Sequence, residues 1–397
     1  MPLNFESGAF LLLIAAVVAM LTRRLHLPYS VGLVAAGVAL ALLPFTPKIN
    51  LTKELIFTAL LPPLIFEAAF SIRWKHLRRD FSVILILATL GVILSAAITS
   101  VGMHLVANWQ WPTAAIFGIL IAATDPVSVL ATFREAKAQG RLLLLVEAES
   151  LLNDATAAIA FGLAITLTSG HSITALGTIT TLLLTIGGGL LAGGIVAGGV
   201  LLLAGRTQDH LVELTFTTVA AYGSFLLAEY FHGSGVLATL VAGLLLGNYG
   251  ALGRISERGM EAVRVFWEFA AFVANSLVFL LIGMHEALQN FAAVWLPVVA
   301  GILLVTLGRA AAIYPICLLF SRTALYVTMP HRHVLFWGGL RGALALALAL
   351  GLPADMPGRE QIITVSFAVV AFSIFVQGLT MTPLLRKMGE IPAEPAD

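Results

Sequence analysis

The chain has 397 residues, of which 59% are hydrophobic and only 11% are charged, and its net charge is +1 at pH 7. Soluble globular domains carry roughly 25% charged residues, so this composition excludes an ordinary soluble globule and indicates a protein with many membrane spans. The nearly balanced charge gives no electrostatic support for a nucleic-acid partner. The single cysteine, Cys317, excludes an internal disulfide.

Apolar runs near the length that a helix needs to cross the hydrocarbon core recur along the whole chain. We therefore predict an all-α polytopic membrane protein with about 13 transmembrane helices. In chain order, the predicted spans are 8–22, 27–45, 52–72, 82–107, 112–133, 142–168, 174–204, 210–231, 234–250, 263–284, 292–321, 334–352 and 361–385.

The positions of Lys and Arg predict the orientation, because short cytoplasmic loops hold most of these residues. With the predicted spans, 17 of the 22 lysines and arginines fall on one side, whereas Lys48, Lys53 and Arg359 fall on the other. Arg309 and Arg341 lie inside spans. This distribution favours an odd number of spans, with the N-terminus outside and the C-terminus in the cytoplasm. The short loops suit a bacterial inner membrane.

Two of the predicted spans, the fifth and the twelfth, are interrupted near their middles. In the fifth, Pro126 removes a backbone donor and clashes with the preceding turn. In the twelfth, glycines flank Arg341 and weaken the helix by roughly 1 kcal/mol each. If the first six spans match the last six, the fifth and twelfth spans correspond to each other and cross the membrane in opposite directions. Secondary transporters with inverted repeats have this arrangement. Broken helices at matching positions predict a binding site at the middle of the membrane.

The sixth predicted span carries the polar run 149–154. In a helix with about 3.6 residues per turn, Glu149 and Asn153 share one stripe, while Ser150 and Asp154 share the neighbouring stripe. Asp154 lies about 20 Å from the cytoplasmic start of the span, near the middle of the hydrocarbon core. A carboxylate at that depth costs about 2.5 kcal/mol or more, so it persists where it faces a cavity or carries ions. Asp154 is therefore a candidate site residue.

Carboxylate, hydroxyl and carbonyl oxygens in these two spans suit sodium, because hard cations prefer oxygen ligands. A carboxylate that holds either one cation or one proton releases one as it binds the other. Exchange of one cation for one proton at Asp154 follows, and it is electroneutral because Asn153 adds no second acid. Potassium remains an alternative substrate, since the sequence does not fix the ligand distances.

Two other classes of protein share some of these features. Asp125 and Asp154 lie at similar depth on adjacent spans, as the paired acids of an intramembrane aspartyl protease would. Neither Thr-Asp-Pro nor Asn-Asp resembles the motifs expected around such acids. A passive cation channel also uses polar half-helices, but it needs a continuous pore. Glu213, Glu229 and Glu268 lie near span ends, and they are expected to be solvated or to snorkel toward the membrane surface.

Six motifs follow one another along the chain: Leu-Pro-Pro-Leu-Ile-Phe-Glu at 61–67, Ala-Thr-Asp-Pro at 123–126, Glu-Ser-Leu-Leu-Asn-Asp at 149–154, Gly-Ser-Gly-Val-Leu-Ala at 233–238, Phe-Trp-Glu at 266–268 and Gly-Gly-Leu-Arg-Gly at 338–342. With these motifs, nearly the whole chain resembles a prokaryotic member of the monovalent cation:proton antiporters, in the branch that includes animal sodium/proton exchangers. Ala148 departs from the pattern, since the family usually has Gly there.

The resemblance implies roles for individual residues. Ion and proton binding is expected at Asp154, Asn153, Ser150, Thr124, Asp125 and Glu67, with sodium held by Asp154, Ser150, Thr124 and Asp125. Glu149 is expected to pair with Arg309, and Pro126 and Arg341 are expected to support the helix breaks. No enzyme activity and no cofactor are implied besides the transported Na⁺ (or Li⁺ or K⁺) and H⁺.

The resemblance also implies an architecture and a biological role. The broken fifth and twelfth helices cross within a single transporter domain, 1–397. In it, 1–107 and 174–284 supply the dimer interface and scaffold, and 112–168 and 292–385 supply the ion-translocating core. The implied protein is a homodimer among the lipids of the cell membrane that serves pH homeostasis by alternating access.

Overall fold

The computed structural model describes residues 5–25, 27–43, 52–126, 129–130, 133, 140–168, 175–250, 255–287, 289 and 291–391. Within these ranges the chain is almost entirely helical, and an isolated antiparallel bridge between Asp125 and Leu340 is the only strand-like pairing. Lys48 and the residues 127–128 and 131–132 of the fifth predicted span lie outside the described residues.

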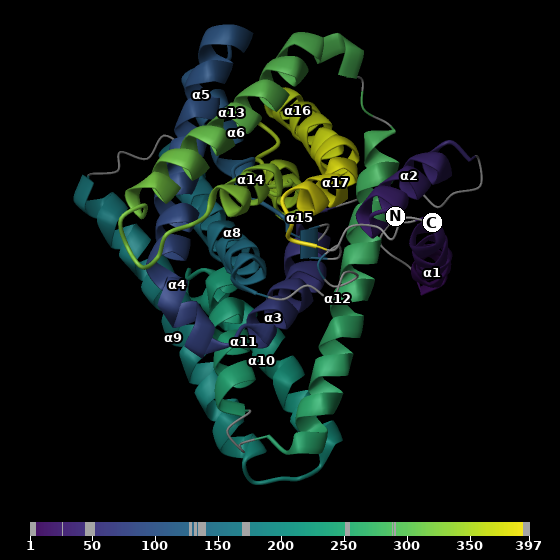
Figure 1. Cartoon of the computed structure of the whole chain (residues 1–397), viewed down its shortest axis with the longest axis vertical. Coiled ribbons are helices and arrows are strands. Elements are labelled where there is room, and N and C mark those ends of the chain that lie inside the picture. Colours follow the sequence, from purple (N-terminus) through teal and green to yellow (C-terminus); the bar gives the residue numbers. More distant parts are fainter. Residues whose placement is uncertain are drawn as a thin grey trace. The chain divides into compact units, whose positions relative to one another are not determined.

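Figure 1 labels the helices whose bounds the structure describes. They are α1 Phe5–Leu25, α2 Tyr29–Ala41, α3 Leu61–Ser71, α4 Trp74–Ile86, α5 Val92–Ala107, α6 Trp111–Leu120, α8 Arg141–Thr168, α9 Ala175–Ala204, α10 His210–Tyr230, α11 Gly235–Tyr249, α12 Glu257–Glu286, α13 Trp295–Leu319, α14 Met329–Trp337, α15 Ala343–Leu350, α16 Arg359–Phe372 and α17 Leu379–Lys387. Short π-helical turns precede α3, join α4 to α5 and join α16 to α17.

The prediction of an all-α membrane protein is confirmed. Among the described residues, eight helices are long and apolar enough to cross a membrane, and shorter apolar helices accompany them. Each of the thirteen predicted ranges contains helix, but thirteen as the number of crossings stays a prediction. The helix of the fourth range begins at Trp74 rather than at 82. Its first turns carry basic residues, so a search for apolar runs misses them.

The chain forms two compact units. The first holds residues 1–53, 83–153 and 276–397, and the second holds 54–82 and 154–275. The boundaries therefore fall within α8, after Asn153, and within α12, after Asn275. The predicted division grouped 82–107 with the scaffold, whereas α5 shares its unit with α6 and α13. Because that division concerns which helices dimerise and which move, it stays a prediction.

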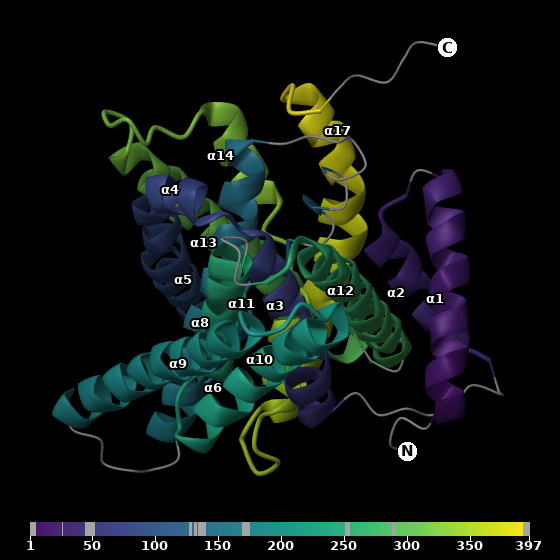
Figure 2. The ribbon, with the colours of Figure 1, turned by 90° about the horizontal axis from the view of Figure 1, so that it is seen from below.

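In the first unit, α5 packs against both α6 and α13, and both Figure 1 and Figure 2 show α5 beside α13. Small residues permit the close approach. A Cβ atom on Gly118 of α6 would lie 2.5 Å from the carbonyl oxygen of Ala96, and one on Gly308 of α13 would lie 2.9 Å from that of Ser95. Glycines that let two backbones approach are typical of helix packing in lipid. This packing also brings Ala122, in the chain that leaves α6, against Val92 and Ala96 of α5.

In the second unit, α11 packs against α3, α9 and α10. A Cβ atom on Gly243 of α11 would lie 2.9 Å from the carbonyl oxygen of Phe66 in α3, so glycine is needed at this crossing. The ring of Phe66 also packs on Trp267 of α12, with 4.5 Å between the ring centroids. The indole N–H of Trp267 donates to the hydroxyl of Thr217 at 3.0 Å. Aromatic packing and a satisfied indole therefore hold this core together.

The prediction of a solvated Glu213 is wrong. Its residue is only 1% exposed, and its carboxylate accepts hydrogen bonds from the backbone N–H of Ser256 at 2.8 Å and from the Ser256 hydroxyl at 2.7 Å. Ser256 immediately precedes α12, where backbone N–H groups lack partners within the helix. Glu213 thus supports the start of α12, a role that depends on a contact between distant parts of the chain.

Candidate ion-binding site

The fifth and twelfth segments are interrupted where the sequence predicts, and the two interruptions cross. Helix α6 ends at Leu120, and the second break separates Trp337 from Ala343. The backbone N–H of Asp125 donates to the carbonyl oxygen of Leu340 at 2.7 Å. This bond ties the two breaks directly to each other.

Arg341 strengthens the crossing. Its Nη1 donates to the carbonyl oxygens of Ala122 and Ala123 at 3.1 and 3.2 Å, and its residue is only 2% exposed. Both carbonyls lie in the non-helical chain after α6, where buried carbonyl groups need a partner from elsewhere, and the guanidinium of the second break supplies it. The crossing also needs Gly342, since a Cβ atom there would lie 2.6 Å from the Cβ of Asp125.

Asn153 of α8 holds Thr124 of the first break in place. Its side-chain oxygen accepts from the backbone N–H of Thr124 at 3.1 Å, and its amide nitrogen donates to the hydroxyl of the same residue. The Thr124 hydroxyl also lies 2.9 Å from that of Ser150. All three residues are buried. Their oxygens therefore form a compact polar group in which the amide of Asn153 is a structural clamp.

Glu149 and Arg309 form a buried ion pair. Nη1 and Nη2 of Arg309 donate to the two carboxylate oxygens of Glu149 at 2.8 and 2.9 Å, and Nη2 also donates to the carbonyl oxygen of Leu335 at 3.0 Å. Oε1 of Glu149 accepts a further bond from the Asn153 amide at 3.0 Å. Two parallel charge-assisted bonds are the strong geometry for such a pair. The pair joins α8, α13 and α14 to the clamp on Thr124.

The remaining predicted site residues lie on α8, at the first break and on α3. Asp154 follows Asn153 on α8 and is half-buried, as are Asp125 and Pro126 at the first break. Glu67 is buried, at 8% exposure, on α3 of the second unit. The structure therefore brings together Thr124, Ser150, Asn153, Glu149 and Arg309. Ion binding at Asp154, Asp125 and Glu67 stays a prediction.

Ser373 is part of this arrangement, although the sequence analysis did not select it. Its hydroxyl accepts from the backbone N–H of Arg341 at 3.0 Å, lies 3.1 Å from the Arg341 carbonyl oxygen and donates to that of Val370 at 2.9 Å. It starts the π-helical turn that ends at Gly378. A sequence signal existed, because Ser373 and Gln377 are polar residues four positions apart within an apolar span.

Sequence comparison places the chain in a known family. The profile described as "Sodium/hydrogen exchanger, transmembrane" matches residues 10–387. The chain belongs to the sodium/hydrogen exchanger family. The predicted membership is confirmed, and the family is one of transporters.

Relatives of this exchanger-family chain match it over most of its length. It is 37% identical over 368 residues to the Na(+)/H(+) antiporter ApNhaP of Aphanothece halophytica, a match that covers 92% of this chain and 70% of the relative. It is 33% identical over 393 residues to the Na(+)/H(+) antiporter NhaH of Halobacillus aidingensis, with 96% of each chain covered.

A solved structure has the same fold. The sodium proton antiporter MjNhaP1 from Methanocaldococcus jannaschii, solved at pH 8, superposes with a TM-score of 0.76 over 96% of this chain and 97% of that chain, at 19% sequence identity. The exchanger-family chain therefore shares its architecture with a solved antiporter, although few residues are identical.

Proposed function

We propose that this protein exchanges sodium ions for protons across the membrane. The observation that carries the proposal is the buried group of Thr124, Ser150 and Asn153 at the first helix break, in a chain of the sodium/hydrogen exchanger family. Helix interruptions that meet polar side chains are how secondary transporters build ion sites. The names of ApNhaP and NhaH specify sodium, which favours sodium over potassium as the substrate.

Asp154 is the residue at which the two ions compete. It follows the clamp residue Asn153 on α8, one helical turn after Ser150, and a carboxylate binds either a hard cation or a proton. We assign Ser150, Thr124 and Asp125 as further oxygen ligands of the sodium ion, and Glu67 as an acid that reaches it. Each turnover then carries one sodium ion in one direction and one proton in the other.

The neighbouring residues position these ligands. Asn153 fixes the backbone and hydroxyl of Thr124, and the Glu149–Arg309 pair fixes Asn153. Arg341 and Pro126 maintain the two breaks that expose carbonyl oxygens. Because these supporting hydrogen bonds are made before the ion arrives, the ligands can bind a dehydrated ion without a rearrangement of the protein.

Transport proceeds by alternating access. In this proposal, 112–168 and 292–385 form the moving core, and 1–107 and 174–284 form the scaffold through which two copies dimerise. The N-terminus lies outside and the C-terminus in the cytoplasm of a cell that uses the exchange for pH homeostasis. Crosslinks that fix core to scaffold are expected to stop exchange and to leave sodium binding intact.

The test is proton flux in proteoliposomes during separate pulses of sodium, lithium and potassium, with Asp154→Asn as the inactive variant. Asp209→Asn is a matched control, because Asp209 caps α10 through the N–H of Leu211 at 2.9 Å and Asn caps helices equally well. Saturable sodium-driven flux in the native protein and in the control, absent from Asp154→Asn, supports the proposal. Flux with potassium alone, equal flux in Asp154→Asn, or a large conductance without counter-transport contradicts it.

A further inference from the structure

A small cavity lies in the first unit behind the ion-pair network. It is bordered by the second helix break, α13 and the segment from α16 to the following π-helical turn. The space in which the centre of a water molecule can lie is about 10 Å³. Its polar side chains come from Thr306, Arg309, Arg341, Ser373 and Gln377; Gly339 and apolar side chains form the other walls. A cavity of this volume holds about one water molecule.

The Nε of Arg309, a residue that lines the cavity, lacks a hydrogen bond among the described residues. Nη1 and Nη2 of Arg309 bind Glu149 and Leu335, but its Nε is buried and has no partner among the described residues. Arg309 itself is only 7% exposed. Buried N–H groups almost always have a partner in the protein or in an ordered water. The Nε of Arg309 therefore calls for a ligand that accepts a hydrogen bond.

Gly339 keeps the space beside this N–H open. A Cβ atom at Gly339 would lie 2.6 Å from the Nε of Arg309, so any side chain there would fill the position that a ligand needs. Because the two terminal nitrogens of Arg309 are held by Glu149, the guanidinium has no simple way to turn toward another partner.

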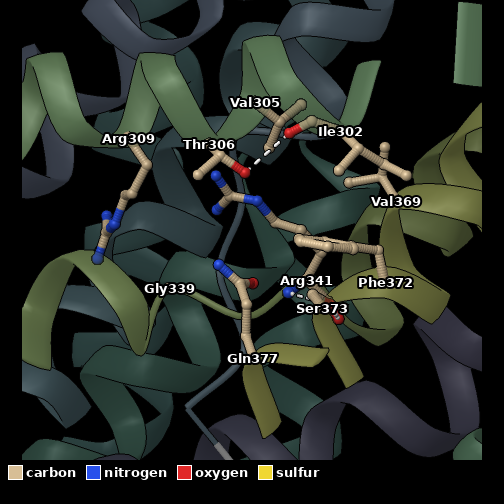
Figure 3. Close-up of a pocket in the computed structure, with 10 residues that line it drawn as sticks. All are labelled: Ile302, Val305, Thr306, Arg309, Gly339, Arg341, Val369, Phe372, Ser373 and Gln377. Atoms are coloured by element: carbon tan, nitrogen blue, oxygen red, sulfur yellow. Dashed lines mark hydrogen bonds between the residues drawn. The ribbon is translucent and has the colours of Figure 1, made fainter. Parts of the chain in front are cut away.

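The rest of the lining selects water rather than an ion. Arg309 and Arg341 exclude a cation by charge. The Thr306 hydroxyl already donates to the carbonyl oxygen of Ile302 at 2.8 Å, so it offers acceptor lone pairs to which a water can donate a hydrogen bond and a simple anion cannot. In Figure 3 the Gln377 amide points toward the space beside the Arg341 guanidinium, below Thr306. Donors and acceptors around one small volume fit a water, which uses both.

We propose that one buried water molecule occupies this cavity, accepts a hydrogen bond from Nε of Arg309 and donates to the oxygens of Thr306 and Gln377. Thr306 and Gln377 are then positioning residues for Arg309. The water thus helps to hold Arg309 against Glu149. Glu149 in turn binds Asn153, and Asn153 holds Thr124. The water site follows from geometry alone, whereas its effect on sodium affinity rests on the proposed function.

The first test is a structure of the native protein at a resolution that shows ordered internal waters. A density peak within hydrogen-bond distance of the Arg309 Nε, the Thr306 hydroxyl and the Gln377 side chain is expected. An empty cavity beside other ordered internal waters would overturn the proposal. A peak that bromide replaces when chloride is exchanged would overturn it as well, because the ligand would be an anion. Neither outcome bears on sodium exchange.

The second test compares Thr306→Val, which keeps the shape and removes the acceptor, with Thr306→Ser, which keeps the hydroxyl. The valine variant is expected to lose the water and to raise the KM for sodium about fivefold with little change in kcat, and the serine variant is expected to restore both. Gln377→Met provides the same comparison if the valine variant does not fold. Equal KM values for native protein, valine and serine variants, with the water retained in all three, would refute the positioning role.

Discussion

The backbone N–H of Asp125 donates to the carbonyl oxygen of Leu340 across 2.7 Å, and these two residues come from helix breaks more than two hundred positions apart. The bond sets the register in which the breaks cross. It places Arg341 against the carbonyl groups of Ala122 and Ala123, and it leaves Thr124 on the side of α8. The geometry of the candidate ion site therefore depends on the crossing as much as on the polar residues.

Gly342→Ala is expected to disrupt the crossing. The added methyl group would lie 2.6 Å from the Cβ of Asp125, at a place where both backbones are fixed, so we expect a loss of about 1–3 kcal/mol of stability. Thermal unfolding in detergent measures it. Gly162→Ala on α8 is the control, because a Cβ atom there meets no described atom within 4 Å. Equal stability of the two variants would contradict the prediction.

Replacing only Arg309 of the Glu149–Arg309 pair is expected to lower the stability of the protein more than replacing both residues. Arg309→Met leaves the Glu149 carboxylate buried without its partner, which costs about 3–5 kcal/mol in comparable buried pairs. The double variant Glu149→Leu with Arg309→Met is expected to regain most of that stability while losing exchange activity. A double-mutant cycle of thermal unfolding measures the coupling, and additive losses would argue against an energetically coupled pair.

Asn153→Asp is expected to destabilise the site at neutral pH. The amide nitrogen that donates to Glu149 at 3.0 Å becomes an oxygen, so two carboxylates face each other and Thr124 loses a donor. We expect a loss of about 1–3 kcal/mol, larger than that of Asn153→Ala, which removes the same donor without adding a charge. Unfolding of both variants distinguishes them. An aspartate variant as stable as the native protein would exclude the clamp.

Sodium-driven proton flux is expected not to respond to membrane potential. One sodium ion exchanged for one proton moves no net charge, and moving one elementary charge across 100 mV would change the free energy of transport by about 2.3 kcal/mol. The measurement imposes a potassium diffusion potential across the proteoliposomes with valinomycin, at constant sodium and pH gradients. A change in initial rate that reverses with the sign of the potential would establish electrogenic exchange instead.

The pKa of His331 is expected to lie below the usual value for histidine. Its position precedes the predicted twelfth span, and burial lowers its pKa below 6.5, with Arg141 acting in the same direction and Glu390, at 3.3 Å, acting against both. The folded state thus binds this proton less tightly than the unfolded state does. Stability is fully present above pH 6.5 and falls as the pH drops from there through the lowered pKa.

Histidine NMR in detergent, assigned with His331→Gln, measures this pKa. Replacing Glu390 with Gln removes the opposing charge, so the Glu390→Gln variant is expected to lower the pKa of His331 further. A native pKa at or above 6.5, or a rise in the variant, would show that the ion pair outweighs burial.

The sequence predicts several parts of the site for local reasons. Proline inside a helix removes a hydrogen bond and clusters of glycine weaken the helix, so Pro126 and the glycines around Arg341 indicate both breaks. Helical periodicity places Glu149, Ser150, Asn153 and Asp154 on one polar face without reference to the rest of the fold. By contrast, neither signal shows that the amide of Asn153 holds Thr124, or that Ser373 holds the backbone of Arg341.

By itself, the sequence determined the class of protein, the approximate spans and the position of their interruptions, because hydrophobic length and helix propensity act within one segment. Only the tertiary structure decided that the N–H of Asp125 meets Leu340, that Arg309 bonds Leu335 as well as Glu149, and that Glu213 is buried at the start of α12. These contacts join segments far apart in the chain. Their geometry follows from how closely small residues such as Gly118 and Gly308 let whole helices approach, and that is a property of packed pairs.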